Sequence, residues 1–430
     1  MNDRMGRCIM GAALLIGLGA VASDWTQFRG PGGLGKAEGA AGLPVTWGTG
    51  ENIVWKCELP GPGTSSPIIV GGKIFTTSYS GYGVSIDEPG EMEELKRHLV
   101  CVDRNSGKVL WQKDFKAEQP ESKYVGRNNT HHGYASSTPV TDGERIYVFF
   151  GISGVYAFDL DGNEVWHAKV GSKTHGWGCA TSLLLHQGLL IVNASIESEA
   201  MVALDARTGK EAWKVEGISK CWASPMLVAV GGRQELVLAI PDGGRERTSK
   251  LKGFDPSTGQ ELWACAGPPD SYLCPSVVSH EGVVYSIGAR NNTALAVRAG
   301  GQGDVSESHA LWSVRGGSNI TSPVYVDGHL YFFHEKGKAV CLDAATGETV
   351  FEEALDPVPG LVYASPLFAD GKLYVASQDH GTYVIEAKPA FRQLAVNTFK
   401  DDPSRVNACI AVSENRLIMR TDQALYCIGE

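Results

Sequence analysis

The chain has 430 residues, of which 43% are hydrophobic and 20% charged, and its formal net charge is −10. This composition is typical of a soluble globular protein with a large core. The negative charge argues against nucleic acid as a partner, because phosphate binding needs a basic face. The 53 glycines, above the usual share of roughly 7%, indicate many turns.

The first 22 residues have the layout of a secretory signal peptide. Arg4 and Arg7 precede an apolar run from Ile9 to Ala22, which ends in small residues. The run is too short and too rich in glycine to favour a membrane-spanning helix. We therefore predict cleavage after residues 1–22, export to the periplasm or the exterior, and no transmembrane span in the remaining chain. We expect residues 23–430 to form one domain and to act as a monomer.

A repeated unit follows along the rest of the chain. Each unit begins with a small residue, usually followed by Pro, and continues with an apolar strand, a Gly turn and a second strand. After a longer first interval the units recur every 43–49 residues or so, about the period of a propeller blade. Eight units begin in this way, at Ser66-Pro67, Thr138-Pro139, Thr181-Ser182, Ser224-Pro225, Pro275-Ser276, Ser322-Pro323, Ser365-Pro366 and Ala408-Cys409.

The second half of each unit is a hairpin that ends in an aromatic residue. In the segment from Asp205 to Trp213, a third strand ends in Asp, a Thr-Gly turn follows, and Trp lies on the fourth strand. Asp can accept hydrogen bonds from the backbone of the turn, and Gly supplies its positive φ. The fifth unit lacks the Asp, and the seventh is degenerate after Tyr383. We predict that the aromatics pack between neighbouring blades; they are Trp55, Trp111, Trp166, Trp213, Trp263, Trp312 and Phe351.

These units predict an all-β fold, an eight-bladed β-propeller of four-stranded antiparallel blades. The segment Asn52 to Trp55 reads as an outer strand without a blade of its own. The eighth unit, conversely, ends near Ile428 without room for a fourth strand. We therefore expect the N-terminal strand to close the last blade, which removes the exposed sheet edges. An open solenoid would need polar caps, and none is visible in the sequence.

The motif Asp-x-x-Thr-Gly-x-x-x-Trp resembles the tryptophan-docking repeat of pyrroloquinoline quinone (PQQ)-dependent alcohol dehydrogenases. The same repeat occurs in the BamB-like propeller of the outer-membrane protein assembly machinery. The opening Trp25-Thr26-Gln27-Phe28-Arg29-Gly30-Pro31 resembles that of secreted PQQ-like propellers abundant in planctomycete-type bacteria. The resemblance implies the fold strongly and the function weakly, because propellers host many functions.

Residues just before each first strand are expected to gather at one mouth of the central channel. Aromatic side chains with a few convergent polar groups are typical of a pocket for a small molecule or a peptide. The candidate ligand-binding residues are His131, His132, His175, Trp177, Trp222, Tyr272, Asn319, Tyr363 and Asn407. Hydrogen bonding between blades is the alternative role for these side chains.

The sequence gives no catalytic residue and no metal site. PQQ dehydrogenases carry a catalytic Asp, calcium ligands and an adjacent Cys-Cys pair; this chain has no Cys-Cys pair, and the others cannot be matched. We therefore expect a non-catalytic propeller that binds an envelope or extracellular protein, or a small ligand, without a cofactor. The alternatives are a dehydrogenase that uses PQQ and calcium, and a sensor or carbohydrate-binding propeller.

Overall fold

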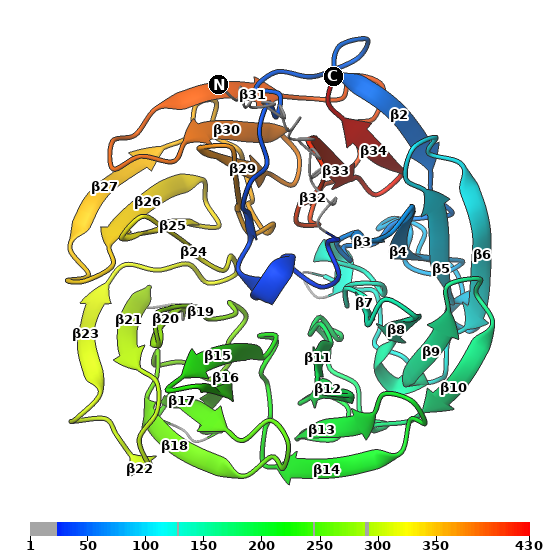
Figure 1. Ribbon diagram of the computed structural model, residues 1–430. Helices are drawn as coiled ribbons and strands as arrows, with labels where there is room; N and C mark the ends of the chain where they lie inside the picture. The colour runs from blue at the N-terminus through cyan, green and yellow to red at the C-terminus, as the bar shows by residue number, and fades with distance from the viewer. Residues whose placement is uncertain (1–23, 127–128, 244–245, 289–291) are drawn as a thin grey trace, which may run out of the picture.

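Eight antiparallel sheets surround a central axis in the computed structural model, which describes residues 24–126, 129–243, 246–288 and 292–430. Figure 1 looks along this axis and shows the sheets as the blades of a ring. The predicted all-β, eight-bladed propeller is therefore confirmed. The predicted signal peptide, residues 1–22, lies outside the described residues.

The blades follow one another around the ring in chain order. Within each blade, the first strand lies next to the axis and the last strand lies at the outer edge. Blades one to four are β3 (Ile68–Val70), β4 (Lys73–Ser80), β5 (Lys96–Asp103) and β6 (Val109–Lys116); β7 (Val140–Thr141), β8 (Arg145–Phe149), β9 (Val155–Asp159) and β10 (Glu164–Ala168); β11 (Leu184–His186), β12 (Leu189–Ala194), β13 (Ala200–Asp205) and β14 (Glu211–Glu216); and β15 (Met226–Val230), β16 (Arg233–Pro241), β17 (Ser249–Phe254) and β18 (Glu261–Ala266). Blades five to seven are β19 (Val278–His280), β20 (Val283–Gly288), β21 (Thr293–Arg298) and β23 (Ala310–Arg315); β24 (Val324–Val326), β25 (His329–Phe333), β26 (Lys338–Asp343) and β27 (Thr349–Ala354); and β28 (Leu367–Ala369), β29 (Lys372–Ala376), β30 (Thr382–Glu386) and β31 (Gln393–Asn397).

The last blade joins an N-terminal strand to the three C-terminal strands of the chain. It consists of β32 (Ala411–Ser413), β33 (Arg416–Arg420), β34 (Ala424–Ile428) and the N-terminal strand β2 (Ile53–Glu58), which pairs antiparallel with β34. Trp55 lies opposite Cys427 in this pairing. The predicted closure is confirmed.

Blade seven has its four strands, as predicted, although its sequence motif is degenerate; β30 and β31 pair without the Asp-Thr-Gly turn. Two blades differ from the prediction, because each gains a short parallel fifth strand. β1 (Lys36–Ala37) joins the inner edge of blade seven, and β22 (Gly303–Asp304) joins the outer edge of blade four.

The aromatics of the outer strands join each blade to the next. The Trp213 indole donates to the Pro256 carbonyl of the following blade at 3.2 Å, and its ring covers Gly259 of that blade's turn. The same arrangement recurs at Trp55, Trp111, Trp166 and Trp312. We call these five contacts the rim. Phe351 packs against Phe391 of blade seven without a polar bond.

Trp263 departs from this pattern. Its indole donates to the Glu235 carboxylate of its own blade at 2.7 Å, and the side chain is completely buried. The fifth unit lacks the Asp-Thr-Gly turn to which the indole would otherwise dock. A carboxylate therefore replaces the missing carbonyl as the acceptor.

A second ring of hydrogen bonds surrounds the axis, which we call the hydroxyl ring. One side chain of each blade accepts the backbone N–H of its counterpart in the preceding blade, at 2.9–3.3 Å. The ring closes on itself through all eight blades. Its members are Ser66, Thr138, Ser182, Ser224, Ser276, Ser322, Ser365 and Cys409.

Residues 25–35, which we call the plug, cross the axis at one end of the channel. Figure 1 shows this segment, with the 3₁₀ helix η1 (Pro31–Gly33), at the centre of the ring. The plug bonds to blade one through Trp25 and Ile69, to blade two through Thr26, and to blade seven through Gly35. The short strand β1 then continues along blade seven.

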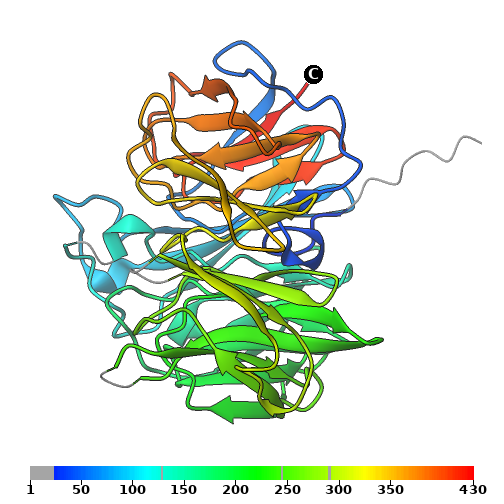
Figure 2. The ribbon, with the colours of Figure 1, turned by 90° about the vertical axis from the view of Figure 1, so that its left-hand side faces the viewer.

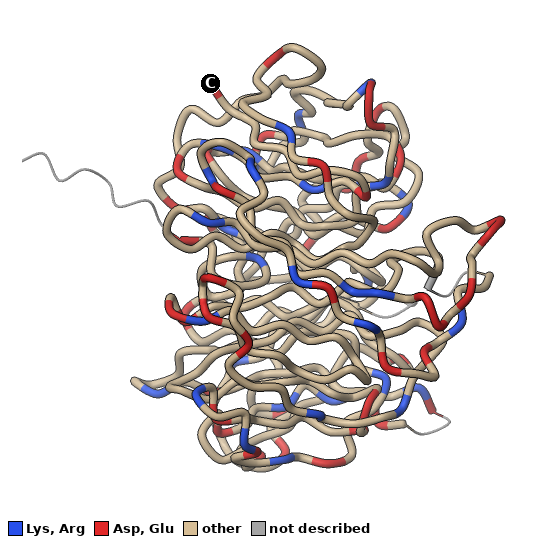
Figure 3. Tube along the Cα trace, turned by 90° about the vertical axis from the view of Figure 1, so that its right-hand side faces the viewer, with Lys and Arg blue, Asp and Glu red and all other residues tan. Residues whose placement is uncertain are grey.

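The opposite face carries the long connection between β4 and β5. This loop, with the 3₁₀ helix η2 (Met92–Glu94), projects from the face away from η1, at the left of Figure 2. Figure 3 shows acidic residues along it. The described residues contain no helix that could cross a bilayer. The nine described cysteines are free thiols, and seven of them are buried.

Candidate functional site

The channel forms a cavity of about 370 Å³ that is closed at one end by the plug, and we call it the cup. Phe28 of the plug and every member of the hydroxyl ring except Thr138 form its floor, and loops that precede the first strands of all eight blades form its wall. The wall residues are Thr64, His131, His132, Ser136, Trp177, Ala180, Trp222, Tyr272, Cys274, Asn319, Ile320, Tyr363 and Asn407.

The structure brings eight of the nine candidate residues to the cup, and the ninth lies next to it. His175 lines a smaller neighbouring cavity instead, and its ring packs edge-on against Trp222 at 5.0 Å. The eight that line the cup are His131, His132, Trp177, Trp222, Tyr272, Asn319, Tyr363 and Asn407. Whether they bind a ligand stays a prediction.

One side of the cup is aromatic. Trp177 lies between Trp222 and Tyr272, with ring centroids 5.3 Å and 4.8 Å away. The Trp222 indole donates to the Gly178 carbonyl at 2.9 Å, and the Tyr272 hydroxyl donates to Asn319 Oδ1 at 3.0 Å. These contacts fix the rings of three consecutive blades before any ligand enters, which lowers the entropic cost of binding.

The other side is polar and reaches across the mouth. The backbone carbonyl of His131, in the 3₁₀ helix η3 (Asn129–His131), accepts Asn407 Nδ2 at 2.8 Å. The His131 ring meets Tyr363 edge-on at 5.6 Å. Blade two is thereby tied to blades seven and eight across the channel.

His132 is a neutral imidazole at neutral pH. Its Nδ1 lies 2.8 Å from Ser136 Oγ, and burial lowers the pKa of the imidazole to about 4. A ligand in the cup therefore meets a hydrogen-bonding ring here and no positive charge.

The described part of the cup lining contains no Asp, Glu, Lys or Arg side chain. Calcium takes oxygen ligands, carboxylates above all. Across the described residues, no group of three or more His, Cys, Asp or Glu is arranged to hold a metal ion. The cup therefore does not offer a ligand set that fits the calcium of a PQQ site.

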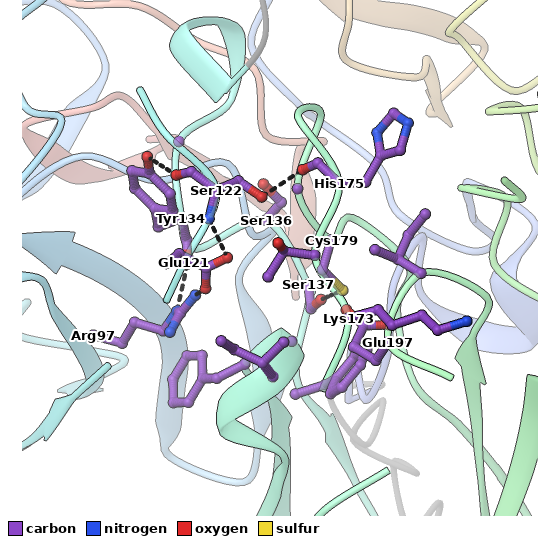
Figure 4. Close-up of a pocket in the computed structure, with 18 residues that line it drawn as sticks. Arg97, Glu121, Ser122, Tyr134, Ser136, Ser137, Lys173, His175, Cys179 and Glu197 are labelled. Carbon is purple, nitrogen blue, oxygen red and sulfur yellow. Dashed lines mark hydrogen bonds and ion pairs between the residues drawn. The ribbon is translucent and has the colours of Figure 1, made fainter. Parts of the chain in front are cut away.

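A second cavity, of about 20 Å³, lies between blades two and three beside the cup (Figure 4). Arg97 and Glu121 form a buried ion pair at 2.5 Å along its wall. Cys179 lies 3.6 Å from the Ser137 hydroxyl. Burial raises the pKa of the Glu197 carboxyl to about 7, and its Oε2 has no hydrogen-bond partner among the described residues. The space admits about one water molecule, so we regard it as structural.

Sequence reasoning missed the floor of the cup. From the sequence, the motif Trp25–Pro31 predicts no place in the fold, and the small residues that begin each unit predict only the start of a blade. In the structure the motif forms the plug: Gly30 has φ +70° and its Cα faces the Trp25 ring so closely that a Cβ would lie 2.6 Å from it. The signal for the hydroxyl ring is present in the sequence, since a small hydroxyl residue recurs at the start of seven of the eight units, with Cys409 in the eighth.

Comparison with solved structures supports the fold. BamB from Moraxella catarrhalis superposes with a TM-score of 0.60 at 14% identity, covering 88% of this chain and 97% of that one. The computationally designed Ika8 protein gives a TM-score of 0.58 at 14% identity, covering 90% and 100%. Quinohemoprotein alcohol dehydrogenase from Comamonas testosteroni gives 0.45 at 12% identity, covering 95% and 80%. Identities this low show the fold alone. No curated protein matches the chain.

The family comparison reaches further than the structural one. The family model described as outer membrane protein assembly factor BamB matches residues 95–307 and 280–422. Together the two matches cover more than half of the chain and run through blades one to eight. The chain therefore belongs to this family of PQQ-like repeat β-propellers.

Proposed function

We propose that this protein is an exported, non-catalytic propeller that holds a small ligand or a segment of a partner protein in the cup. One observation carries the proposal: all eight blades contribute side chains to one blind cavity of about 370 Å³. Its size and its mixture of aromatic and neutral polar groups are typical of binding pockets. A channel that served only to hold the blades together would not need a wall of rings already fixed in place.

The family supports binding over catalysis. Its description names an assembly factor for outer-membrane proteins, which favours a protein as the source of the ligand. The absence of carboxylates from the described lining of the cup favours this proposal over a PQQ- and calcium-dependent dehydrogenase. Addition of PQQ and Ca²⁺ to the purified protein, with alcohol-dependent dye reduction as the readout, is expected to give no turnover.

The cup can be tested by filling it. Ala180 lies on the wall, so Ala180→Trp would occupy much of the space. Ala345, in an exposed rim turn, provides the matched control Ala345→Trp. The probes are naphthoate, naphthamide, methyl glucoside and phenyltrimethylammonium, followed by ligand-observed NMR.

We expect at least one probe to bind the unaltered protein and the Ala345→Trp control, and to lose binding in Ala180→Trp. If no probe binds, or if binding survives Ala180→Trp, the proposed function is wrong. Export is tested separately, by fractionation of cells that carry the full chain or the chain without residues 1–22. Retention of both forms inside the cell would contradict export.

A further inference from the structure

Some hydroxyls of the hydroxyl ring, at the floor of the cup, find no hydrogen-bond acceptor in the described part of the chain. Each ring oxygen accepts one backbone N–H, and each hydroxyl also has a hydrogen to donate. For Ser182, Ser224 and Ser322 no acceptor of that hydrogen is found among the described residues. All three residues line the cup. These three hydroxyls therefore remain available as O–H donors at the floor of the cup.

The wall adds further donors. Asn319 accepts the Tyr272 hydroxyl through Oδ1, so its Nδ2 hydrogens point elsewhere, and within the described chain they meet no acceptor. The Trp177 indole N–H likewise has no acceptor in the part of the chain that the structure describes, although its ring packs against Trp222 and Tyr272. Donor-rich surfaces favour ligands whose polar atoms accept hydrogen bonds.

A buried positive charge lies directly beneath this floor. Arg29 of the plug is 1% exposed. Its Nη2 donates to the carbonyls of Leu34 and of Pro323, the residue after Ser322 of the ring. Arg29 also lies near enough to Cys409 of the ring to offset in part the burial that raises the pKa of that thiol. It therefore sits under the part of the hydroxyl ring that belongs to blades six to eight.

This charge is not compensated within the described chain. Arg29 makes no ion pair with a described Asp or Glu, and its Nε and Nη1 have no hydrogen-bond partner there. Burial lowers the pKa of the guanidinium only to about 10, so it stays protonated at neutral pH. A buried charge without a partner is costly, and its field extends into the low-dielectric cup.

We propose that the cup binds a carboxylate, held by the hydroxyl ring above Arg29, on a ligand whose aromatic or apolar body packs against Trp177 and Trp222. The inference rests on the proposed function, because it names the ligand class of the same cavity. A carboxylate accepts hydrogen bonds from the donors of the floor. Its negative charge also balances the positive charge of Arg29, which has no ion-pair partner among the described residues. Its source is a free organic acid or the C-terminus of a partner chain.

The test compares an acid with its uncharged analogue. Naphthoate and naphthamide share one aromatic body and differ in charge, so their affinities for the unaltered protein, measured by calorimetry, isolate the carboxylate. We expect naphthamide to bind about tenfold more weakly, because charge-assisted hydrogen bonds are about twice as strong as neutral ones. A short peptide that ends in Trp, with a free or an amidated C-terminus, tests the second source.

Arg29→Gln is expected to remove the difference between naphthoate and naphthamide. Arg392→Gln deletes the same charge on an exposed residue that pairs with Glu386 far from the cup, and should preserve the difference. Arg29→Lys keeps the charge and should preserve most of it, and the comparison of acid and amide needs no variant if Arg29 substitutions fail to fold. Equal affinities for acid and amide, or preference for methyl glucoside, would overturn the carboxylate while leaving the cup as a binding site. If no probe binds even the unaltered protein, the proposed function itself is refuted.

Discussion

The rim and the cup use the same side-chain chemistry in opposite ways. At the rim, each docking indole N–H donates a hydrogen bond to a carbonyl of the next blade, as Trp166 does to Ala206 at 3.0 Å. In the cup, Trp177 belongs to the same residue type and yet has no acceptor for its N–H among the described residues. The rim contacts recur at a fixed position of the repeat, whereas the wall residues differ from blade to blade.

The difference indicates where stability and function reside. A repeated contact whose indole N–H already has a protein acceptor contributes to folding, and it offers no free donor to a ligand. An irregular wall above a regular hydroxyl ring keeps donors available while the ring holds the scaffold in place. Substitutions at the rim should therefore change stability without changing binding, and substitutions of the wall should do the reverse.

The largest effect is expected at the rim. Trp213 is 9% exposed, and Trp213→Ala would leave a cavity between blades three and four. We expect the free energy of unfolding, from urea denaturation, to fall by about 4 kcal/mol, with unchanged probe binding in the cup. Trp213→Phe keeps a ring and loses only the hydrogen bond to Pro256, so it should cost about 1 kcal/mol beyond packing changes. A loss of binding in either variant would break the separation of rim and cup.

The small cavity beside the cup should make stability depend on pH. Burial raises the pKa of Glu197 to about 7 from 4.5, so between these values the folded protein binds more protons than the unfolded chain. The stabilisation is complete below about pH 4.5 and is lost as pH rises through 7, an effect of about 3 kcal/mol. Glu197→Gln removes this dependence. The variant should gain stability relative to the unaltered protein between pH 5 and pH 8, measured by urea denaturation at both.

His132 acts in the opposite direction in the same range. Because its pKa is lowered, its contribution is present above the unfolded value and is lost as pH falls. The unaltered protein and the Glu197→Gln variant both contain His132, so its contribution cancels when their stabilities are compared. If the unaltered protein and Glu197→Gln lose stability in parallel as pH changes, Glu197 is ionised at neutral pH and its raised pKa is wrong.

Much of the fold was predictable because it is a repeat. Trp55 without a blade and Ile428 without a partner strand together predicted the closure, and the Asp-Thr-Gly turns predicted the hairpins. Blade seven shows the limit: tertiary pairing completes β30 and β31 where the local motif fails. Trp263 shows another, since its acceptor is a carboxylate that periodicity does not reveal.

The site was predictable in position but not in chemistry. Placement before each first strand brings Trp222 and Asn407 to one mouth in any propeller of this kind. That the other end is closed could not be predicted, because it depends on where residues 25–35 run after leaving blade one. Arg29 therefore could not be assigned to the site from its sequence, although its neighbours formed a recognisable motif.

The docking turns permit a finer test of the rim. Gly209 has φ +72°, and a Cβ there would lie 2.6 Å from the Trp166 ring, whereas Gly217 has φ +80° and no atom within 4 Å. Gly217→Ala therefore reports only the backbone cost, about 1 kcal/mol. We expect Gly209→Ala to lower the free energy of unfolding by about 2 kcal/mol more, because the ring must move. Equal losses would mean that the Trp166 ring does not need this close approach.

The smallest effects are expected in the hydroxyl ring, which belongs to both regions. Ser224→Ala leaves the buried Ser182 N–H without its acceptor, at a cost of about 1.5 kcal/mol. Cys409 is the only ring member with a sulfur acceptor, for the Ser365 N–H at 3.3 Å. Because sulfur accepts hydrogen bonds weakly, Cys409→Ser should raise the free energy of unfolding by about 0.5 kcal/mol. It would also add a hydroxyl donor beside Arg29, so naphthoate affinity should rise with it. A gain in stability without a gain in affinity would place the ring with the rim, as a purely structural device.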